Sequence, residues 1–227
     1  SILLPDGLTY AQKILSLVPS YIWPLWETSG LVMEDIVGTA DGTYSGVTLN
    51  NTPAPGASMR TAGLWDGVND VATANAVTIS GSEFSIGLWV KMLNAGVWTD
   101  GALHCFLEVR VDSSNRFGIW KSAPQEVGVY RVGNGAVVAR TAALSTASWF
   151  LATITCSQAN NRMRLYVADV KQGTDIAVGA FTGTSASVEF GRLTNTGSLY
   201  HSGWLSFGMY FPRELTQPEV AQLATAQ

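Results

Sequence analysis

The sequence of 227 residues has little charge and little cysteine. Asp, Glu, Lys and Arg together make up 13% of it, against about 25% in an average globular domain. The formal net charge is −4 and Lys and Arg do not cluster, which excludes an electrostatic nucleic-acid binder. Two cysteines are too few for a disulfide-built scaffold. No apolar run reaches the roughly 18–20 residues that a membrane-spanning helix needs, so we expect no membrane insertion.

The N-terminus and the two cysteines give two further expectations. The segment from Ser1 to Asp6 has neither a basic stretch nor a long apolar stretch, so we expect no secretory signal. Cys105 and Cys156 each share an apolar face of an alternating segment. We expect two buried free thiols, because an unpaired cysteine behaves as a small apolar side chain. A disulfide between them is the alternative.

Two short helices are predicted to frame a long β region. The first is expected near residues 10–18, where Thr9 and Gln12 have the spacing of a capping box. Its apolar stripe comprises Ala11, Ile14, Leu15 and Val18. The second is expected near residues 217–224, with Thr216 as its N-cap.

Between these helices, apolar residues alternate with the period of a β-strand. Residues 84–90, 163–167 and 205–211 are clear examples. Turn dipeptides such as Asp-Gly and Asn-Gly separate such segments, and many short strands at this spacing predict an all-β sandwich or barrel. Because no break in composition divides the chain, we expect one domain over residues 20–227, preceded by a helical lead over residues 1–19.

Eight segments resemble, in order, the strands and turns of laminin-G-like jelly rolls. They lie at residues 23–30, 41–49, 64–70, 84–91, 149–152, 165–169, 203–205 and 213–216. Leu-Trp-Asp-Gly-Val-Asn-Asp at 64–70 is similar to the family's strand-turn-strand motif, and Phe-Ser-Ile-Gly-Leu-Trp-Val-Lys at 84–91 to the strand after it. The resemblance implies a concanavalin A-like jelly-roll sandwich of two antiparallel sheets, with a short N-terminal and a short C-terminal helix. The helical opening together with residues 23–30 and 41–49 is similar to versions found in bacteriophage structural and tail proteins.

The sequence offers little for catalysis. Glycoside hydrolysis needs two carboxylates about 5–10 Å apart across a cleft, and the Glu-x-Asp-x-x-Glu strand of laminarinase-type members of this fold is missing. The nearest pair is Glu108 and Asp112, with Arg110 between them. Alternation places both on one strand face, which we interpret as a solvated polar face carrying an ion pair. No nucleophile elbow or zinc spacing accompanies His104 and His201, so we expect no enzyme.

Calcium is the one cofactor that the resemblance brings into question. Related folds often bind it between the opening strand and an Asp of the closing strand. Glu27 matches the first position, but Ser206 occupies the second, so we expect no metal and no other cofactor. Asp66 and Asp70 could supply carboxylate ligands or form Asx turns at a strand reversal; both interpretations stay open.

Aromatic residues are the remaining functional signal, since eight tryptophans are many for this length. We select Trp98, Trp120 and Tyr130 as candidate ligand-binding residues. Alternation places Trp120 and Tyr130 opposite the apolar face of their strands, and Trp98 precedes Asp100-Gly101, a predicted loop tip. Exposed rings of this kind bind the apolar face of a sugar, contribute to a protein interface or pack against a loop of the same chain. The sequence does not distinguish these three roles.

These observations favour a non-enzymatic binding module. The first hypothesis is a virion-associated or cell-surface protein, such as a capsid decoration or tail component, that recognises a glycan or a neighbouring protein. The second is a purely architectural virion subunit without a glycan ligand, whose N-terminal helix docks on a partner or packs on its own sandwich. The third is a glycoside hydrolase. We expect a virion or extracellular location, and homo-oligomerisation is left open.

Overall fold

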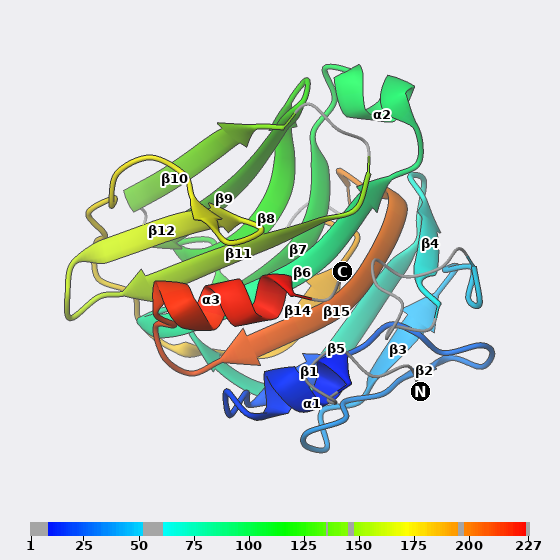
Figure 1. Cartoon of the computed structure of the whole chain (residues 1–227), viewed down its shortest axis with the longest axis horizontal. Coiled ribbons are helices and arrows are strands. Elements are labelled where there is room, and N and C mark those ends of the chain that lie inside the picture. Colours follow the sequence, from blue (N-terminus) through cyan, green and yellow to red (C-terminus); the bar gives the residue numbers. More distant parts are fainter. Residues whose placement is uncertain (1–8, 52–60, 135, 145–147, 195–197, 226–227) are drawn as a thin grey trace.

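Two antiparallel β-sheets stack face to face in a computed structural model that describes residues 9–51, 61–134, 136–144, 148–194 and 198–225 (Figure 1). The seven-stranded sheet has the order β1 (Tyr21–Trp23), β15 (Ser202–Phe211), β6 (Glu83–Met92), β11 (Phe150–Ser157), β12 (Arg162–Val167) and β13 (Val170–Lys171), and β4 (Gly63–Asp66) also pairs with β15. The eight-stranded sheet has the order β10 (Ala136–Ala143), β9 (Glu126–Gly133), β8 (Asn115–Ala123), β7 (His104–Asp112), β14 (Thr184–Phe190), β5 (Val71–Ser80), β3 (Gly42–Ser45) and β2 (Val32–Met33). The predicted all-β jelly-roll sandwich is confirmed.

The main core fills the space between the two sheets. Alternating residues of each strand point into it, and Phe84 of β6 stacks on Phe117 of β8 with ring centroids 3.9 Å apart. Both cysteines are free and buried, as predicted. Cys156 belongs to this core, whereas Cys105 faces away from it. Burial of apolar area between the layers, at about 25 cal/mol per Å², is the main source of stability.

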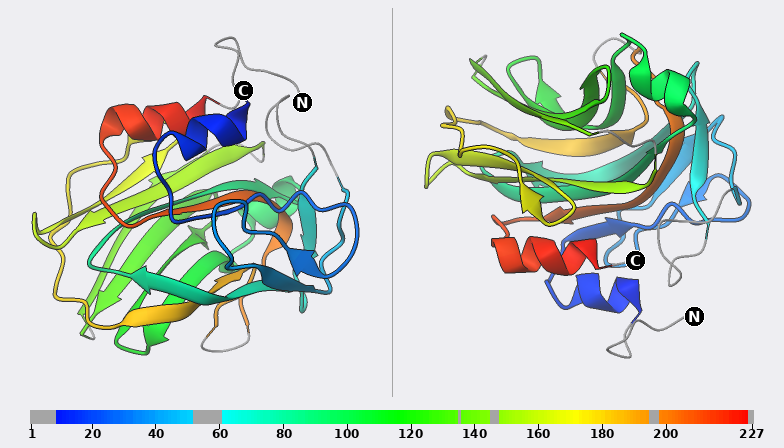
Figure 2. Two further views of the ribbon diagram at one scale, coloured as in Figure 1. Left: turned by 90° about the horizontal axis from the view of Figure 1, so that it is seen from below. Right: turned by 45° about the horizontal axis from the view of Figure 1, so that its top comes forward.

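A second apolar cluster lies on the outer side of the seven-stranded sheet. There the helices α1 (Tyr10–Leu15) and α3 (Gln217–Ala224) lie side by side across the strands (Figure 2). The hydroxyl of Tyr10 donates to the carbonyl of Leu223 at 2.8 Å and accepts from the indole Nε1 of Trp89 at 2.8 Å. The N-terminal helix therefore packs on its own chain. Within the described residues, no helix has the length and apolar character to cross a bilayer.

The first helix differs from its prediction in length and in its buried stripe. Its capping box of Thr9 and Gln12 forms as predicted, but the helix ends at Leu15. The buried residues are Tyr10, Ile14 and Leu17, while Leu15 and Val18 are exposed. The helix ends three residues before the predicted boundary, and Val18 at that boundary has a positive φ of 58°, outside the helical region.

A bulge in β15 divides a segment that we expected to bury on one face. The register of β15 against β6 shifts between Ser206 and Met209. Leu205 consequently points into the main core, whereas Phe207 and Met209 point into the second cluster under α1. An extra residue in one strand reverses the side-chain alternation beyond it, so the prediction of a single face over residues 205–211 is wrong.

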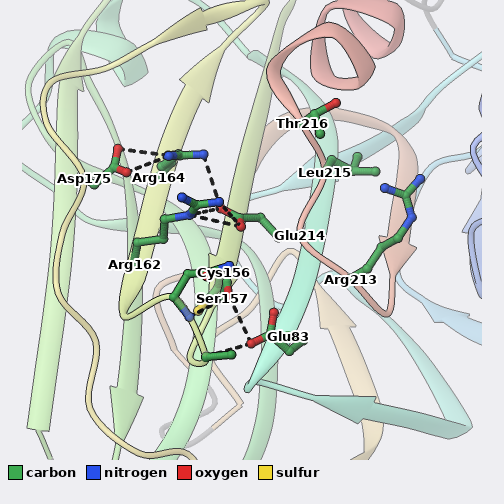
Figure 3. Close-up of polar contacts among 12 residues, drawn as sticks. Glu83, Cys156, Ser157, Arg162, Arg164, Asp175, Arg213, Glu214, Leu215 and Thr216 are labelled. Atoms are coloured by element: carbon green, nitrogen blue, oxygen red, sulfur yellow. Dashed lines mark hydrogen bonds and ion pairs between the residues drawn. The ribbon is translucent and has the colours of Figure 1, made fainter.

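An ionic network connects the segment before α3 to strand β12 (Figure 3). Arg162 donates to Glu214 from Nε, at 2.8 Å and 3.1 Å to its two oxygens, and from Nη2 at 2.7 Å. Arg164 bridges Glu214, at 3.3 Å, and Asp175, at 2.6 Å. The hydrogen bonds from Arg164 hold the pKa of Asp175 well below its usual range. Arg213 points away from this network and pairs with Glu219 of α3 at 2.7 Å.

Candidate functional site

A small pocket opens on the outer side of the eight-stranded sheet, where β8, β9 and β10 meet the segment after β14. It encloses about 170 Å³ and is lined by Arg116, Trp120, Tyr130, Val132, Ala139 and Leu193. Two of the three ring residues selected from the sequence, Trp120 and Tyr130, therefore contribute to one pocket. Their ring centroids are 5.0 Å apart, with the planes inclined at 48°. Trp120 is half-buried, whereas Tyr130 is only 5% exposed, so the expectation that its ring is exposed is wrong.

Two glycines let these rings lie close to the sheet. In the pairing of β8 with β9, Gly118 is opposite Tyr130 and Gly128 is opposite Trp120. A Cβ atom on Gly128 would lie 2.4 Å from the indole Nε1 of Trp120, and one on Gly118 would lie 3.0 Å from Cε1 of Tyr130. A larger residue at Gly128 would meet the Trp120 ring, and one at Gly118 would meet the carbonyl of Leu107, at 2.4 Å, as well as the Tyr130 ring, so each ring covers the glycine of the neighbouring strand.

Trp98 does not join this pocket, and its predicted exposure at a loop tip is wrong. It lies in α2 (Ala95–Thr99), a short helix that begins where the side chain of Asn94 caps the amide of Val97. Trp98 is 2% exposed and belongs to the main core, with its ring 5.7 Å from that of Phe150. Its indole Nε1 donates to the carbonyl of Leu144 at 2.7 Å, so both its ring and its polar atom are used in packing.

A buried carboxylate supports the pocket from beneath. Glu108 of β7 has no solvent exposure, so the prediction of a solvated face is wrong at this position. One of its oxygens accepts from the hydroxyl of Tyr130 at 2.5 Å and the other from the amide of Thr194 at 2.8 Å. Its ion-pair partner is Arg116 of β8, at 3.7 Å, and not Arg110, the arginine between the two acids in the sequence. Glu108 is thus contacted by Tyr130 of β9 and by Thr194 of the segment that follows β14.

Burial keeps the groups around Glu108 protonated. It raises the pKa of Tyr130 well above its ordinary value, and the nearby Cys105 and Glu108 raise it further. Burial likewise raises the pKa of the Cys105 thiol well above its usual range. Tyr130 is therefore a neutral phenol that donates to Glu108, and Cys105 is not a nucleophile at neutral pH, since the thiolate is the reactive form.

Asp112 does not form a pair with Glu108. The register of β7 against β8 shifts between Arg110 and Asp112, which interrupts the alternation on which the predicted shared face depended. Asp112 instead accepts from the amide of Ser114 at 2.7 Å, in the turn between the two strands. The two carboxylates that a glycosidase needs across a cleft are not assembled from this pair.

Sequence reasoning misplaced Cys105 because β7 carries a second bulge. The register with β8 also shifts between Cys105 and Leu107, and Phe106 is the extra residue. Cys105 is therefore opposite Trp120 on the outer face, whereas Phe106 and Leu107 both belong to the main core. Sequence reasoning also did not identify Leu193 as a pocket residue, because it lies on a segment without strand periodicity.

The residues considered for calcium make other contacts. Asp66 accepts from the amides of Val68 at 2.7 Å and Asn69 at 3.3 Å, which is the Asx-turn interpretation. The two carboxylate oxygens of Glu27 accept from the amide of Glu34 and the hydroxyl of Tyr44. Across the part of the chain that the structure describes, no three His, Cys, Asp or Glu side chains gather in a way that could hold a metal ion.

A second hollow lies beside Glu27. It encloses about 240 Å³ and is lined by Trp26, Glu27, Thr28, Ser29 and Glu34. Its polar lining is acidic, and one edge of the Trp26 ring packs against Phe207 in the second cluster, with centroids 5.4 Å apart. The ring of Trp26 is the one aromatic ring that lines this hollow, and part of it is used in packing. The outer-face pocket is lined by two aromatic rings, those of Trp120 and Tyr130.

Comparison with known proteins supports the fold. No curated protein matches the sequence. The binding domain of botulinum neurotoxin serotype D has a similar structure, with a TM-score of 0.71 and 14% identity over 92% of this chain and 52% of that one. The serotype D ligand binding domain in complex with N-acetylneuraminic acid gives 0.68 and 13% over 95% and 53%. The type G receptor binding domain gives 0.65 and 15% over 90% and 50%.

The chain spans about half the length of these structures, and at such low identity the likeness is one of fold. It agrees with the predicted laminin-G-like resemblance, as does the family model, which matches residues 66–221. That range includes strands of both sheets, the two rings of the pocket and most of α3. The chain belongs to the concanavalin A-like lectin/glucanase superfamily.

Proposed function

We propose that the chain is a carbohydrate-binding module whose ligand occupies the outer-face pocket. The observation that carries this proposal is the pair of aromatic rings, Trp120 and Tyr130, held against opposing glycines beside the guanidinium of Arg116. Ligand sites combine apolar and aromatic walls with a few placed polar groups. The apolar C–H face of a sugar packs on such rings, while a polar side chain fixes its orientation.

The size of the pocket restricts the ligand to a small group. Its 170 Å³ is below the range of about 300–1,000 Å³ that is usual for sites of drug-sized molecules. A single sugar ring or the terminal residue of a glycan is of suitable size. One similar structure is described as a complex with N-acetylneuraminic acid, but this chain covers 53% of it. That likeness supports a lectin-like role without locating the sugar.

The module is proposed to bind without catalysis, on a virion or an outer cell surface. Both oxygens of Glu108 accept hydrogen bonds, and Asp112 lies beyond the bulge, so neither is arranged as a general acid. The location is supported by the resemblance of the helical opening to phage structural and tail proteins. Neighbouring genes for capsid or tail proteins would strengthen it, whereas a metabolic operon would contradict it. A purely architectural subunit would bind no glycan.

A glycan array followed by calorimetry on the glycans bound tests the proposal. We expect Trp120→Ala to weaken binding by about tenfold or more, the cost of removing a central aromatic contact. The matched control is Trp204→Ala, a half-buried tryptophan on β15 whose Nε1 donates to Asn51 at 3.0 Å. It lies in the other sheet, so binding should be unchanged. An array without any bound glycan, or equal losses in the two variants at similar melting temperatures, would overturn the proposal.

A further inference from the structure

The polar chemistry of the outer-face pocket is almost entirely that of a hydrogen-bond donor. Of the six lining residues, Arg116 is the only charged one, and Val132, Ala139 and Leu193 are aliphatic. The hydroxyl of Tyr130 donates to Glu108 and is not available to donate to a ligand. A guanidinium has five N–H donors and no acceptor. A ligand in the pocket would therefore contact the rings of Trp120 and Tyr130 and the guanidinium of Arg116.

Arg116 forms an ion pair with Glu108 but donates no hydrogen bond to a residue that the structure describes. Its guanidinium is 3.7 Å from Glu108, beyond hydrogen-bond distance, and 5.9 Å from the ring centroid of Tyr130. Among the residues that the structure describes, it donates no hydrogen bond, and its buried Nε has no partner. Its side chain is 24% exposed. Unpaired donors beside a pocket are costly unless a ligand pairs with them.

A second cation lies next to Arg116. Arg110 is its direct cross-strand partner in the pairing of β7 with β8, on the same outer face. Like charges directly opposite one another destabilise a sheet, and one buried N–H of Arg110 also has no partner among the described residues. An anion bound at this end of the pocket would relieve that repulsion.

Building on the proposed function, we infer that the pocket binds an acidic saccharide: an oxyanion on the sugar, a carboxylate or a sulfate, pairs with Arg116 while the ring packs on Trp120 and Tyr130. A carboxylate or sulfate is an acceptor that matches the guanidinium in two parallel hydrogen bonds. A neutral sugar hydroxyl also carries an O–H donor, and Glu108, which is fully buried beneath the pocket, already accepts from Tyr130 and Thr194.

The test uses three matched probes: methyl glucoside, glucuronic acid and glucose 6-sulfate. Each is titrated into the full chain by calorimetry or by NMR at constant ionic strength. We expect at least one acidic probe to bind about tenfold or more tightly than the neutral probe, the value of a charge-assisted pair. Preference for glucuronic acid over the sulfate, or the reverse, identifies which oxyanion the pocket takes.

Two arginine variants distinguish a direct contact between Arg116 and the ligand from general electrostatic attraction of an anion to the positively charged surface. Arg116→Gln should remove the preference for the acidic probe, while Arg110→Gln, which changes the same charge outside the pocket lining, should retain most of it. If Arg116→Gln does not fold, Arg116→Lys replaces it; this variant keeps the charge without the planar fork, and the preference should shrink.

The outcomes distinguish the inference from the function on which it rests. If neutral and acidic probes bind equally well, glycan binding stands and the acidic ligand is excluded. If the two glutamine variants lose the preference equally, Arg116 makes no specific contact and the inference is overturned. If no probe binds and the glycan array is also empty, both the inference and the proposed function are wrong.

Discussion

Replacing Tyr130 by phenylalanine would test how the buried carboxylate of Glu108 is held. Tyr130→Phe keeps the ring that faces the pocket and removes the hydroxyl that donates to Glu108 at 2.5 Å. Glu108, with no solvent exposure, would retain the amide of Thr194 at 2.8 Å and Arg116 at 3.7 Å. A hydrogen bond to a charged group is worth about 1.5–3 kcal/mol. We therefore expect the free energy of unfolding to fall by about 2 kcal/mol.

The same change should cost less once the charge is removed. In a Glu108→Gln background, the hydroxyl of Tyr130 donates to a neutral amide oxygen, and such a bond contributes about 0.5–1.5 kcal/mol. The double-mutant cycle thus predicts a coupling of about 1 kcal/mol between the two positions. Urea unfolding at pH 7, followed by tryptophan fluorescence, measures all four proteins under the same conditions.

Additive costs would refute this reasoning. If the two substitutions add to within about 0.3 kcal/mol, the hydroxyl and the carboxylate do not interact as the structure describes. Glycan affinity provides a second measurement on the same proteins. Because Tyr130→Phe preserves the ring, the glycan affinity should change little. A large loss of affinity would mean that the ligand forms a hydrogen bond with the hydroxyl, which contradicts the conclusion that Tyr130 donates only to Glu108.

Three further predictions concern stability. Burial lowers the pKa of His201 from 6.5 to about 3, so its contribution to folding is complete above pH 6.5 and is lost as the pH falls toward 3. Urea unfolding between pH 7 and pH 5 should show a slope of up to about 1.4 kcal/mol per pH unit that His201→Phe lacks; an unchanged slope would contradict this. Glu214→Gln should cost about 1–2 kcal/mol by breaking the network on β12, against less than about 0.5 for the exposed Asp169→Asn; equal costs would show that the network contributes nothing. Tyr10→Ala should cost about 3–5 kcal/mol in thermal unfolding, because it opens the second cluster and unpairs Trp89, and a loss below about 1 kcal/mol would mean that α1 is not docked.

Much of the fold could be predicted from local pattern because its physical causes are local. Alternation over residues 84–90 predicts a strand, and β6 follows it into the main core. The capping boxes of Thr9 and Thr216 predict the starts of α1 and α3, since a side chain satisfies backbone donors within three residues. Residues 10–18 show the limit: the apolar spacing continues to Val18, but the helix ends at Leu15 and Val18 has a positive φ, which the spacing does not encode.

Trp98 shows why the burial of some residues could not be predicted from the sequence. Its neighbours Thr99 and Asp100 are typical of a turn, and a five-residue helix is too short to have a recognisable period. What buries this ring is a contact with Phe150 and a hydrogen bond to Leu144, about fifty residues away in sequence. Exposure of a single aromatic is a tertiary property, so residues beside it in the chain could not predict it.

The pocket itself lies between these two cases. The segments Gly118-Ile119-Trp120 and Gly128-Val129-Tyr130 share a Gly-x-aromatic pattern. When two such segments form an antiparallel hairpin, each ring can lie opposite the other's glycine, and β8 and β9 have this register. The pattern is visible in the sequence, but its meaning depends on the pairing. The bulges in β7 and β15 show that pairing cannot be assumed from alternation alone, because one extra residue reverses every face beyond it. A repeated Gly-x-aromatic in a predicted hairpin is therefore a usable sign of an aromatic pocket only after its turn has been located.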